Sequence, residues 1–482
     1  MTIFLISFLF GISISQFVPT YIIFGLYPGI ILSIFYLFLN SRKLDISKVS
    51  KGIVIMLIGL TFGIIIFKYH QNNVIYLPKE SVGIETSKEA VILDIPVSGN
   101  YNYSTKAKID EQYVLLRYKD TELNYGDKVI VEGEYELPES FSNDYGVAFD
   151  YPKFLEAKGI NYIFEAKRLE KISSHHAPLI QEYLYDLRQS ITSTINRLVH
   201  GPYSGLINGI LIGEKSGLNK DLKDSMARVG VIHIAVLSGY NIMIVAMGLF
   251  YSLSKFSWRV ASIVSLLSII MIVLMSGAEP PAVRAGLLGL IVLLGKIIVH
   301  RQMHVGRALL LIASVIVFFN PYSLLYDISF QLSFLATLGL VYVSPIISNN
   351  LKFITEKFGL REIISATIGA QIAVTPLLLH TTGVFSIVSL PANILVLPAV
   401  PLLMLSGFLV SVFGNILSIM AYPFVWICHL LSAYVIYIVN LFDRIPVTVF
   451  YIEDTWSVIL IYFVFGFIYW KLRRNDLQKL SN

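Results

Sequence analysis

The sequence predicts a polytopic α-helical membrane protein, with about 10–12 apolar spans, some of them broken, and a small inserted β-barrel outside the membrane. Hydrophobic residues make up 55% of the 482 residues and charged residues 14%, against about 25% charged residues in a soluble domain. The apolar residues gather in runs long enough to cross a bilayer. One stretch of roughly a hundred residues instead shows short alternating runs separated by turn signals, which is typical of strands.

The N-terminal region, residues 1–70, contains three apolar runs, 3–18, 21–39 and 52–67, and the first and third are near the short limit for a span. A basic cluster lies between the second and third runs: Arg42, Lys43, Lys48 and Lys51. By the positive-inside rule this loop is expected to be cytoplasmic. The N-terminus is then inside and the residues after Phe67 are outside. Basic residues at the end of the chain also predict that residues 473–482 form a cytoplasmic tail.

Residues 71–172 are expected to form an extracytoplasmic, OB-fold-like β-barrel, because five or so short strands in under a hundred residues suit a small barrel. Between Lys79 and Lys171, 12 Lys and Arg stand against 18 Asp and Glu, so the insert is acidic while the remainder of the chain is basic. Tyrosines are frequent in it and either stack on single-stranded bases or belong to the barrel core: Tyr101, Tyr103, Tyr113, Tyr118, Tyr125 and Tyr135. The acidic balance argues against a strong phosphate-binding groove.

Residues 173–200 predict an amphipathic helix on the membrane or on the helical bundle, because apolar residues recur at nearly helical spacing: Leu179, Tyr183, Leu187, Ile191, Ile195 and Leu198. Residues 201–472 are expected to form the main transmembrane region. Its candidate spans lie near 229–253, 258–276, 281–299, 306–320, 326–345, 361–380, 384–413, 416–441 and 456–471. Proline and glycine interrupt several of them, and a broken helix at membrane depth is tolerated where it lines a cavity.

The stretch Ser204–Phe250 is the most informative part of the chain. A charged segment with Lys215, Lys220, Lys223 and Arg228 precedes an apolar run that carries His233, Ser238 and Asn241. Polar groups inside an apolar run are costly unless something polar meets them. These residues are candidates for a polar path. The alternatives are a polar helix cap at the membrane surface, a satisfied core histidine and solvated loop charges.

Five further polar residues within or beside spans are candidates for the same path: Arg284, Asp327, Gln331, Thr375 and Asn393. Asp327 and Gln331 stand four apart and share a helix face. Arg284 offers a planar guanidinium that matches phosphate geometry, or it forms a structural ion pair with Glu279. Thr375 and Asn393 stand near prolines and either open a helix toward a channel or belong to a kinked structural helix.

Five segments, in order along the chain, resemble the ComEC/Rec2 competence family: Tyr145–Ile160, Ser204–Phe250, Pro280–Gly295, Asp327–Val341 and Thr375–Leu403. The resemblance implies a channel that carries single-stranded DNA across the bacterial cytoplasmic membrane during natural transformation. It also implies a separate DNA receptor and a cytoplasmic helicase-like translocase. Asn241 stands where the family usually has histidine, so a role that depends on that histidine does not carry over.

Full-length relatives often add a metallo-β-lactamase-like domain, whose metal motif does not occur in this sequence. We therefore expect no nuclease activity in this polypeptide, no cofactor and no metal site, with any nuclease on a separate protein. The pair His175 and His176 lacks carboxylates at ligand spacing, and a single cysteine, Cys428, excludes an internal disulfide. No Walker A pattern occurs, so a motor would also be separate.

A rival interpretation is a secondary transporter or flippase for a smaller anionic solute, in which Asp327 and Arg284 form a midplane site between broken helices. A DNA path needs a continuous lining of Lys, Arg and aromatic side chains, whereas a small solute needs a closed pocket. A scaffold with no conducting path is a third interpretation.

Overall fold

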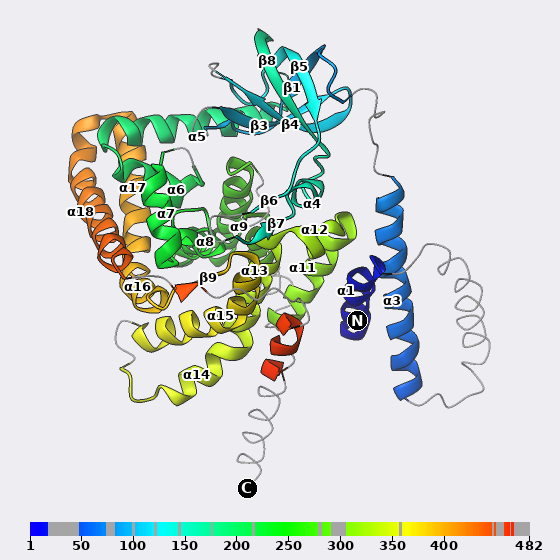
Figure 1. Ribbon diagram of the computed structural model, residues 1–482. Helices are drawn as coiled ribbons and strands as arrows, with labels where there is room; N and C mark the ends of the chain where they lie inside the picture. The colour runs from blue at the N-terminus through cyan, green and yellow to red at the C-terminus, as the bar shows by residue number, and fades with distance from the viewer. Residues whose placement is uncertain are drawn as a thin grey trace.

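The computed structural model in Figure 1 describes residues 1–17, 48–73, 82–98, 102–119, 123–142, 146–174, 176, 178–214, 217–277, 282–290, 305–355, 359–445, 448–449, 457–462 and 464–466. Within these residues the chain is mostly helical, and one small closed β-barrel stands above the helices. The predicted fold class, a polytopic α-helical membrane protein with an inserted barrel, is confirmed. The expected span 21–39 and the basic residues Arg42 and Lys43 lie outside the described residues.

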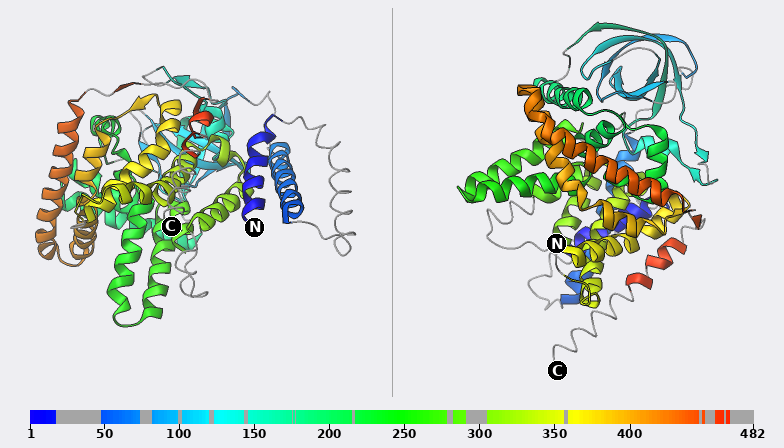
Figure 2. Two further views of the ribbon diagram at one scale, coloured as in Figure 1. Left: turned by 90° about the horizontal axis from the view of Figure 1, so that it is seen from below. Right: turned by 90° about the vertical axis from the view of Figure 1, so that its left-hand side faces the viewer.

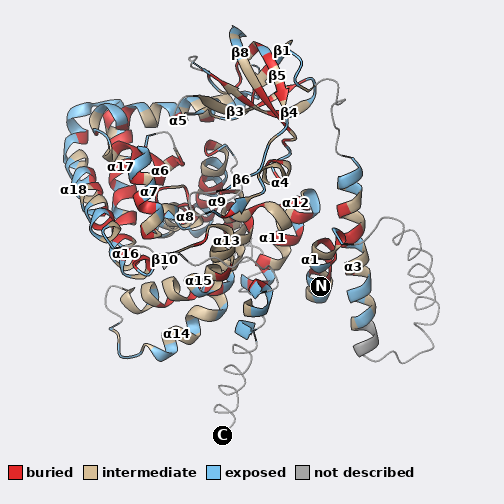
Figure 3. Ribbon diagram, in the orientation of Figure 1, coloured by how far each residue is buried: buried red, intermediate tan, exposed pale blue. Residues whose placement is uncertain are grey.

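Among the described residues, six helices are long and apolar enough to cross a membrane: Gly52–Asn72, Trp258–Met275, Ile328–Asn350, Leu360–Thr381, Ala399–Ile416 and Ser418–Asp443. Their outer faces carry exposed apolar side chains (Figure 3), with Trp426 at 72% and Leu430 at 70% exposure on the last of them. Apolar surface on this scale is stable against lipid rather than water. Shorter apolar helices include Thr2–Ser15, Tyr203–Ile212, Gly239–Ser254 and Val305–Phe319.

The barrel is formed by the strands β1 (Thr86–Ile92), β3 (Tyr103–Ile109), β4 (Gln112–Tyr118), β5 (Lys128–Glu136) and β8 (Tyr162–Ser173), with the short β2 (Val97–Ser98) beside β3. Neighbouring strands pair antiparallel except β4 and β8, which are parallel. Pairing of β1 with both β3 and β5 closes the sheet. Five strands in this crossed order form the OB-fold-like barrel that the sequence predicts.

Side chains alternate along the barrel strands between a buried and an open face. Tyr118 and Tyr135 are 1% and 5% exposed and fill the core with Phe164. Burial raises the pKa of the Tyr135 hydroxyl to about 12. Of the two alternatives from the sequence, these two tyrosines therefore belong to the barrel core. Tyr113 is 45% exposed, and Tyr101 lies outside the described residues.

Between β5 and β8 the chain forms a hairpin of β6 (Phe141–Ser142) and β7 (Ala148–Phe149), followed by helix α4 (Tyr151–Glu156). Asp150 caps α4 by accepting a hydrogen bond from the Lys153 amide, and a proline stands in the first turn. Helix α4 packs against α12 (Tyr322–Tyr326), and Asn320 donates a 2.5 Å hydrogen bond to the Ala157 carbonyl. The barrel is thereby joined to the helical part.

The amphipathic helix of the sequence prediction is α5 (Leu179–Leu198). Tyr125 of the barrel donates to the Gln181 side chain, and Tyr185 of α5 donates to Asn124 of the barrel at 3.0 Å. The opposite side of α5 packs against α6, α9 and α17. It therefore lies between the barrel and the bundle (Figure 1).

The remaining elements, in chain order, are α1 (Thr2–Ser15), α3 (Lys48–Asn72), α6 (Tyr203–Ile212), α7 (Lys220–Val229), η2 (Ile232–Ile234), α8 (Gly239–Ser254), α9 (Trp258–Met275), α11 (Val305–Phe319), α12, α13 (Ile328–Leu338), η3 (Gly339–Val343), α14 (Ser344–Asn350), α15 (Leu360–Thr381), β9 (Val384–Phe385), α16 (Ser389–Val396), α17 (Ala399–Ile416), α18 (Ser418–Asp443) and β10 (Thr448–Val449). Residues 282–290 are also helical.

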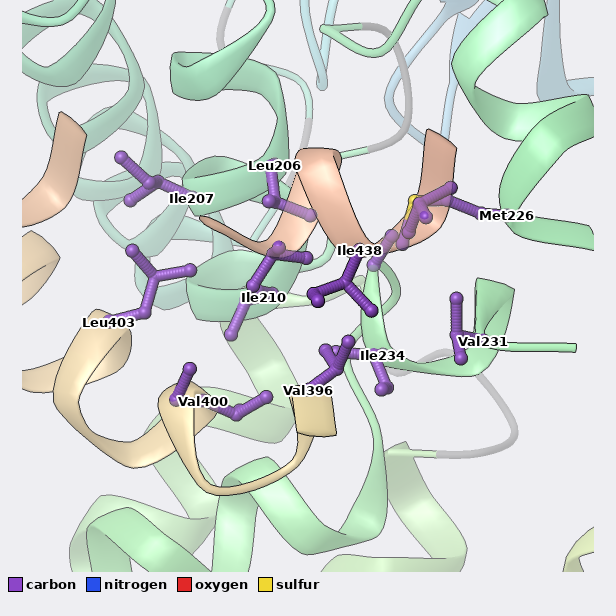
Figure 4. Packing of buried hydrophobic residues seen from close by; sticks show 14 of the residues in the cluster. Leu206, Ile207, Ile210, Met226, Val231, Ile234, Val396, Val400, Leu403 and Ile438 are labelled. Carbon is purple, nitrogen blue, oxygen red and sulfur yellow. The ribbon is translucent and has the colours of Figure 1, made fainter. Parts of the chain in front are cut away.

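Two of the expected spans have other boundaries than the sequence predicts. The apolar run 229–253 is a regular helix only from Gly239, and the run 384–413 divides into α16 and α17 next to Pro398. The largest core joins α6, α7, η2, α16, α17 and α18. Figure 4 shows Ile210, Val396 and Ile438 of this core converging from three helices.

Candidate functional site

Arg284 and Asp327, which the sequence indicates as separate candidates, lie together. The Arg284 side chain is 5% exposed, and its Nη1 is 3.6 Å from Asp327 Oδ2. Its Nη2 donates a 2.7 Å hydrogen bond to the Ser329 carbonyl, and the guanidinium carbon lies 5.8 Å from the centre of the Phe330 ring. The remaining donor, Nε, is buried with no hydrogen-bond partner in the described part of the chain. Glu279, the alternative partner of Arg284, lies outside the described residues.

Asp327 and Gln331 hold the junction of α12 and α13. Asp327 is the N-cap of α13 and accepts a 3.1 Å hydrogen bond from the Phe330 amide. The Gln331 amide donates to the carbonyls of Leu324 and Leu325 at 2.9 and 3.0 Å. Those carbonyls belong to the last turn of α12, which a helix leaves unpaired. Gln331 thus fixes the turn that presents Asp327 to Arg284.

Ser238 and Asn241 form the N-terminal cap of α8. The Ser238 hydroxyl accepts a 3.3 Å hydrogen bond from the Asn241 amide, and the Asn241 side chain donates to the Ile210 carbonyl of α6 at 3.0 Å. Asn241 is 1% exposed. The alternative of a helix cap is confirmed, and Asn241 additionally joins α8 to α6.

His233 lies on the irregular segment that connects α7 to α8. Its side chain lies against the backbone of Gly230. Gly230 has φ +79° and ends α7. A Cβ on Gly230 would lie 2.6 Å from the Ser389 Cβ, so only glycine permits this approach of α16.

Thr375 and Asn393 lie on α15 and α16. The Thr375 hydroxyl donates to the Gln371 carbonyl one turn earlier, at 2.7 Å, directly before Pro376. Thr375 also lines an apolar recess of about 430 Å³ between α15 and the β9 region. Asn393 is 6% exposed, and its Oδ1 has no hydrogen-bond partner among the described residues. The Gln371 amide donates to the Ser389 hydroxyl at 2.5 Å and joins α15 to α16.

These contacts close a cycle that we call the motif ring. It consists of residues 230–241, helix 282–290, α13 with η3, α15 and α16. A Cβ on Gly239 would lie 2.9 Å from Ala285 Cβ, Arg284 binds the start of α13, and α13 packs on α15. Gln371 then reaches Ser389, which stands against Gly230. Four of the five segments that carried the sequence resemblance contribute to this ring.

The basic residues of α7 differ from one another. Arg228 donates from Nε to Asp443 Oδ1 at 2.7 Å and from Nη2 to Asp443 Oδ2 at 2.8 Å, a bidentate pair that fastens α7 to the end of α18. Lys220 is exposed and Lys223 is half-buried. Lys215 lies outside the described residues. Arg228 is therefore a structural residue, and Lys220 and Lys223 are the two lysines of α7 that can meet a phosphate.

We expect the double variant Lys220→Gln, Lys223→Gln to bind single-stranded DNA more weakly. The slope of the logarithm of the binding constant against the logarithm of salt concentration should become less steep by about 0.7 for each phosphate contact that is lost. Filter binding over a salt series measures this slope. The matched variant Arg228→Gln breaks the pair with Asp443 and is expected to lower thermal stability while the slope stays the same. A slope unaffected by the removal of both lysines would contradict DNA binding at α7.

On the barrel, the most open aromatic side chain of β4 is not free for an incoming base. The Lys106 ammonium lies 4.4 Å from the centre of the Tyr113 ring and donates to the Lys158 carbonyl at 3.1 Å. Burial lowers the pKa of Lys106. A lysine held in this way contributes little to a phosphate-binding groove, in line with the acidic balance of the insert.

Several residues in and around the ring were not identified from the sequence: Glu214, Gln371, Ser386, Ser389 and Asp443. The Ser386 hydroxyl is buried without a hydrogen-bond partner among the described residues. Arg188 of α5 reaches Glu214 at 3.5 Å and the Met275 carbonyl at 3.0 Å. The signal that could have found Gln371 and Asp443 is an amide or a carboxylate within a long apolar run. In the described part of the chain no three His, Cys, Asp or Glu side chains are grouped as metal ligands.

Comparison with known proteins places the same segments in a family. The family model "Competence protein" matches residues 210–476. ComE operon protein 3 of Bacillus subtilis (strain 168) is 29% identical over 263 residues, which are 54% of this chain and 32% of that protein. The match thus spans about a third of the length of that relative. No solved structure matches the chain. Because the family match covers more than half of the sequence and includes the motif ring, the protein belongs to the Competence protein family.

Proposed function

We propose that this protein takes part in competence as a membrane channel for single-stranded DNA, which it carries across the bacterial cytoplasmic membrane during natural transformation. The observation that carries the proposal is the motif ring. Segments far apart in the sequence meet there. One of them, 230–238, is not a regular helix, and neither is the connection 382–388 between α15 and α16. Irregular backbone at membrane depth is tolerated where it is buried in protein or lines a water-filled path, and we propose that segment 230–238 borders such a path.

The chemistry of the ring suits a polyanion. Arg284 supplies a buried guanidinium with one donor, Nε, still unpaired among the described residues, and a guanidinium is well matched to phosphate oxygens. Ser386 and Asn393 supply buried oxygens without a partner in the same part of the chain, which water or sugar hydroxyls can satisfy. Tyr240, 50% exposed beside Gly239, offers an aromatic face on which a base can stack.

The division of the chain follows from this role. Residues 1–70 form the N-terminal transmembrane segments, and residues 71–172 form the extracytoplasmic barrel. Residues 173–200 form the amphipathic helix and residues 201–472 the channel region. Residues 473–482 form the cytoplasmic tail, so that both termini are inside. The energy for transfer comes from a separate cytoplasmic helicase-like translocase. A DNA receptor delivers the strand from outside, and a separate nuclease removes its complement.

The proposal is tested in a transformable host by deleting the gene and following labelled DNA. We expect DNA to bind at the cell surface and to stay sensitive to external nuclease, because no path into the cytoplasm remains. Re-expression of the chain restores protection of the label. Undiminished entry of labelled DNA into the cytoplasm of the deletion strain would contradict the proposal.

The rival function, transport of a smaller anionic solute, is favoured by one observation. Arg284 and Asp327 are only 3.6 Å apart and nearly enclosed, as in a closed solute site. The deletion strain distinguishes the two functions, since a solute transporter leaves DNA entry intact. Proteoliposomes that take up a labelled anion but pass no oligonucleotide would support the rival.

A further inference from the structure

The helical hairpin of α8 and α9 projects from the rest of the described chain, as both views of Figure 2 show for the green pair of helices. Helix α9 has 18 residues and α8 has 16. At 1.5 Å per residue they are about 27 and 24 Å long, close to the thickness of the hydrocarbon core. The Ser257 hydroxyl caps α9, so the hairpin turn at residues 255–257 is a defined structure.

One end of this hairpin is fixed at the barrel. The C-terminal end of α9 contacts α5, where the Met275 carbonyl accepts a hydrogen bond from Arg188. The next turn contains Gly277, and a Cβ there would lie 3.3 Å from the Asp94 carboxylate of the barrel. The hairpin extends sideways from this end, as the right view of Figure 2 shows, and its tip lies about one helix length away.

The tip has the composition of a membrane interface. Phe256 is 88% exposed, and Tyr251 and Trp258 are 63% and 42% exposed beside it. Lys255 and Arg259 are both exposed. They are the only charged residues between Gly239 and Gly277, a segment with no Asp or Glu. No ion pair joins either of them to a carboxylate in the part of the chain that the structure describes.

We infer that the tip of the α8–α9 hairpin is a binding site for anionic phospholipid headgroups. The aromatic rings lie at headgroup depth, where their apolar bodies meet acyl chains and their polar edges meet water. Lys255 and Arg259 bind headgroup phosphates. The inference does not depend on what the protein transports.

The test is tryptophan quenching in the full-length protein reconstituted into vesicles of phosphatidylcholine with phosphatidylglycerol. Trp258 is kept and the other tryptophans are replaced by phenylalanine (Trp426→Phe, Trp456→Phe and Trp470→Phe). Brominated phosphatidylglycerol should quench Trp258 more strongly than brominated phosphatidylcholine at the same mole fraction, because each basic residue enriches anionic lipid by about fivefold. Lys255→Gln with Arg259→Gln should abolish this preference.

A second single-tryptophan protein is the matched control. It keeps Trp426, which is 72% exposed on α18, a helix without Lys or Arg. Both brominated lipids should quench it equally. Equal quenching of Trp258 as well would overturn the inference. If Trp258 shows no preference and the double variant nevertheless loses transformation, the tip binds a protein partner, and the lipid site is refuted.

Discussion

Arg284→Ala is expected to lower entry of labelled DNA by about a hundredfold or more, since leaving Asp327 buried without its partner costs about 3–5 kcal/mol. The side chain is 5% exposed and is the group that joins helix 282–290 to α13. Arg284→Lys should be intermediate, because an ammonium cannot reach both Asp327 and the Ser329 carbonyl as a planar fork does. Transformation frequency and the amount of protein in the membrane are measured together.

A double variant separates transport from folding. Arg284→Met with Asp327→Asn removes both buried charges and keeps an N-cap at position 327, because asparagine caps helices as well as aspartate does. We expect this protein to accumulate in the membrane and to remain inactive. Recovery of DNA entry in the double variant would show that the pair only stabilises the fold.

Gly230→Ala is expected to reduce DNA entry by about tenfold or more, because forcing an extra methyl group into a packed contact costs about 1–3 kcal/mol. The new Cβ would lie 2.6 Å from Ser389 Cβ and would push α16 away from α7, which opens the motif ring. The backbone at φ +79° adds a further cost. Transformation frequency at equal protein level is the measurement.

Two variants serve as controls for Gly230. Gly359 has a similar φ of +68°, and a Cβ there would meet nothing within 4 Å. Gly359→Ala therefore carries the backbone cost alone and should leave most of the activity. Adding Ser389→Gly to Gly230→Ala removes the side chain that the new methyl meets, so it should restore entry. Equal losses from Gly230→Ala and Gly359→Ala would assign the effect to backbone strain.

The fold was largely predictable because two periodicities are plain in the sequence. The alternating runs Tyr113–Tyr118 and Lys128–Tyr135 predict β4 and β5 nearly to the residue, and apolar runs predict most of the helices. Strand β8 shows no regular alternation, because its first three residues are all apolar and charged residues recur after them, and register shifts interrupt its pairing with β5. The start of α8 was misplaced because Val231, Ile234 and Leu237 are apolar yet belong to an irregular, tightly buried segment. Hydropathy alone cannot separate such a segment from a helix.

The candidate site was predictable as a set of residues and less so as an arrangement. Arg284 and Asp327 stand out as charges in apolar runs, but their contact is a tertiary one, and the sequence offered Glu279 as an equally good partner for Arg284. Arg228 resembles a loop charge in the sequence because its partner, Asp443, lies at the far end of the chain. The helix cap formed by Ser238 and Asn241 could be predicted from the sequence, because a cap depends on residues only three positions apart.

Passage of single-stranded DNA through the motif ring is tested by photo-crosslinking during uptake. A benzophenone amino acid replaces Tyr240, at the ring, or Tyr422, on the outer face of α18; the two side chains are 50% and 54% exposed. Cells importing labelled DNA are irradiated, and the protein is isolated under denaturing conditions. We expect a labelled protein for position 240 and none for position 422. Active uptake with no crosslink at position 240, or with equal crosslinks at both positions, would show that the DNA takes another route.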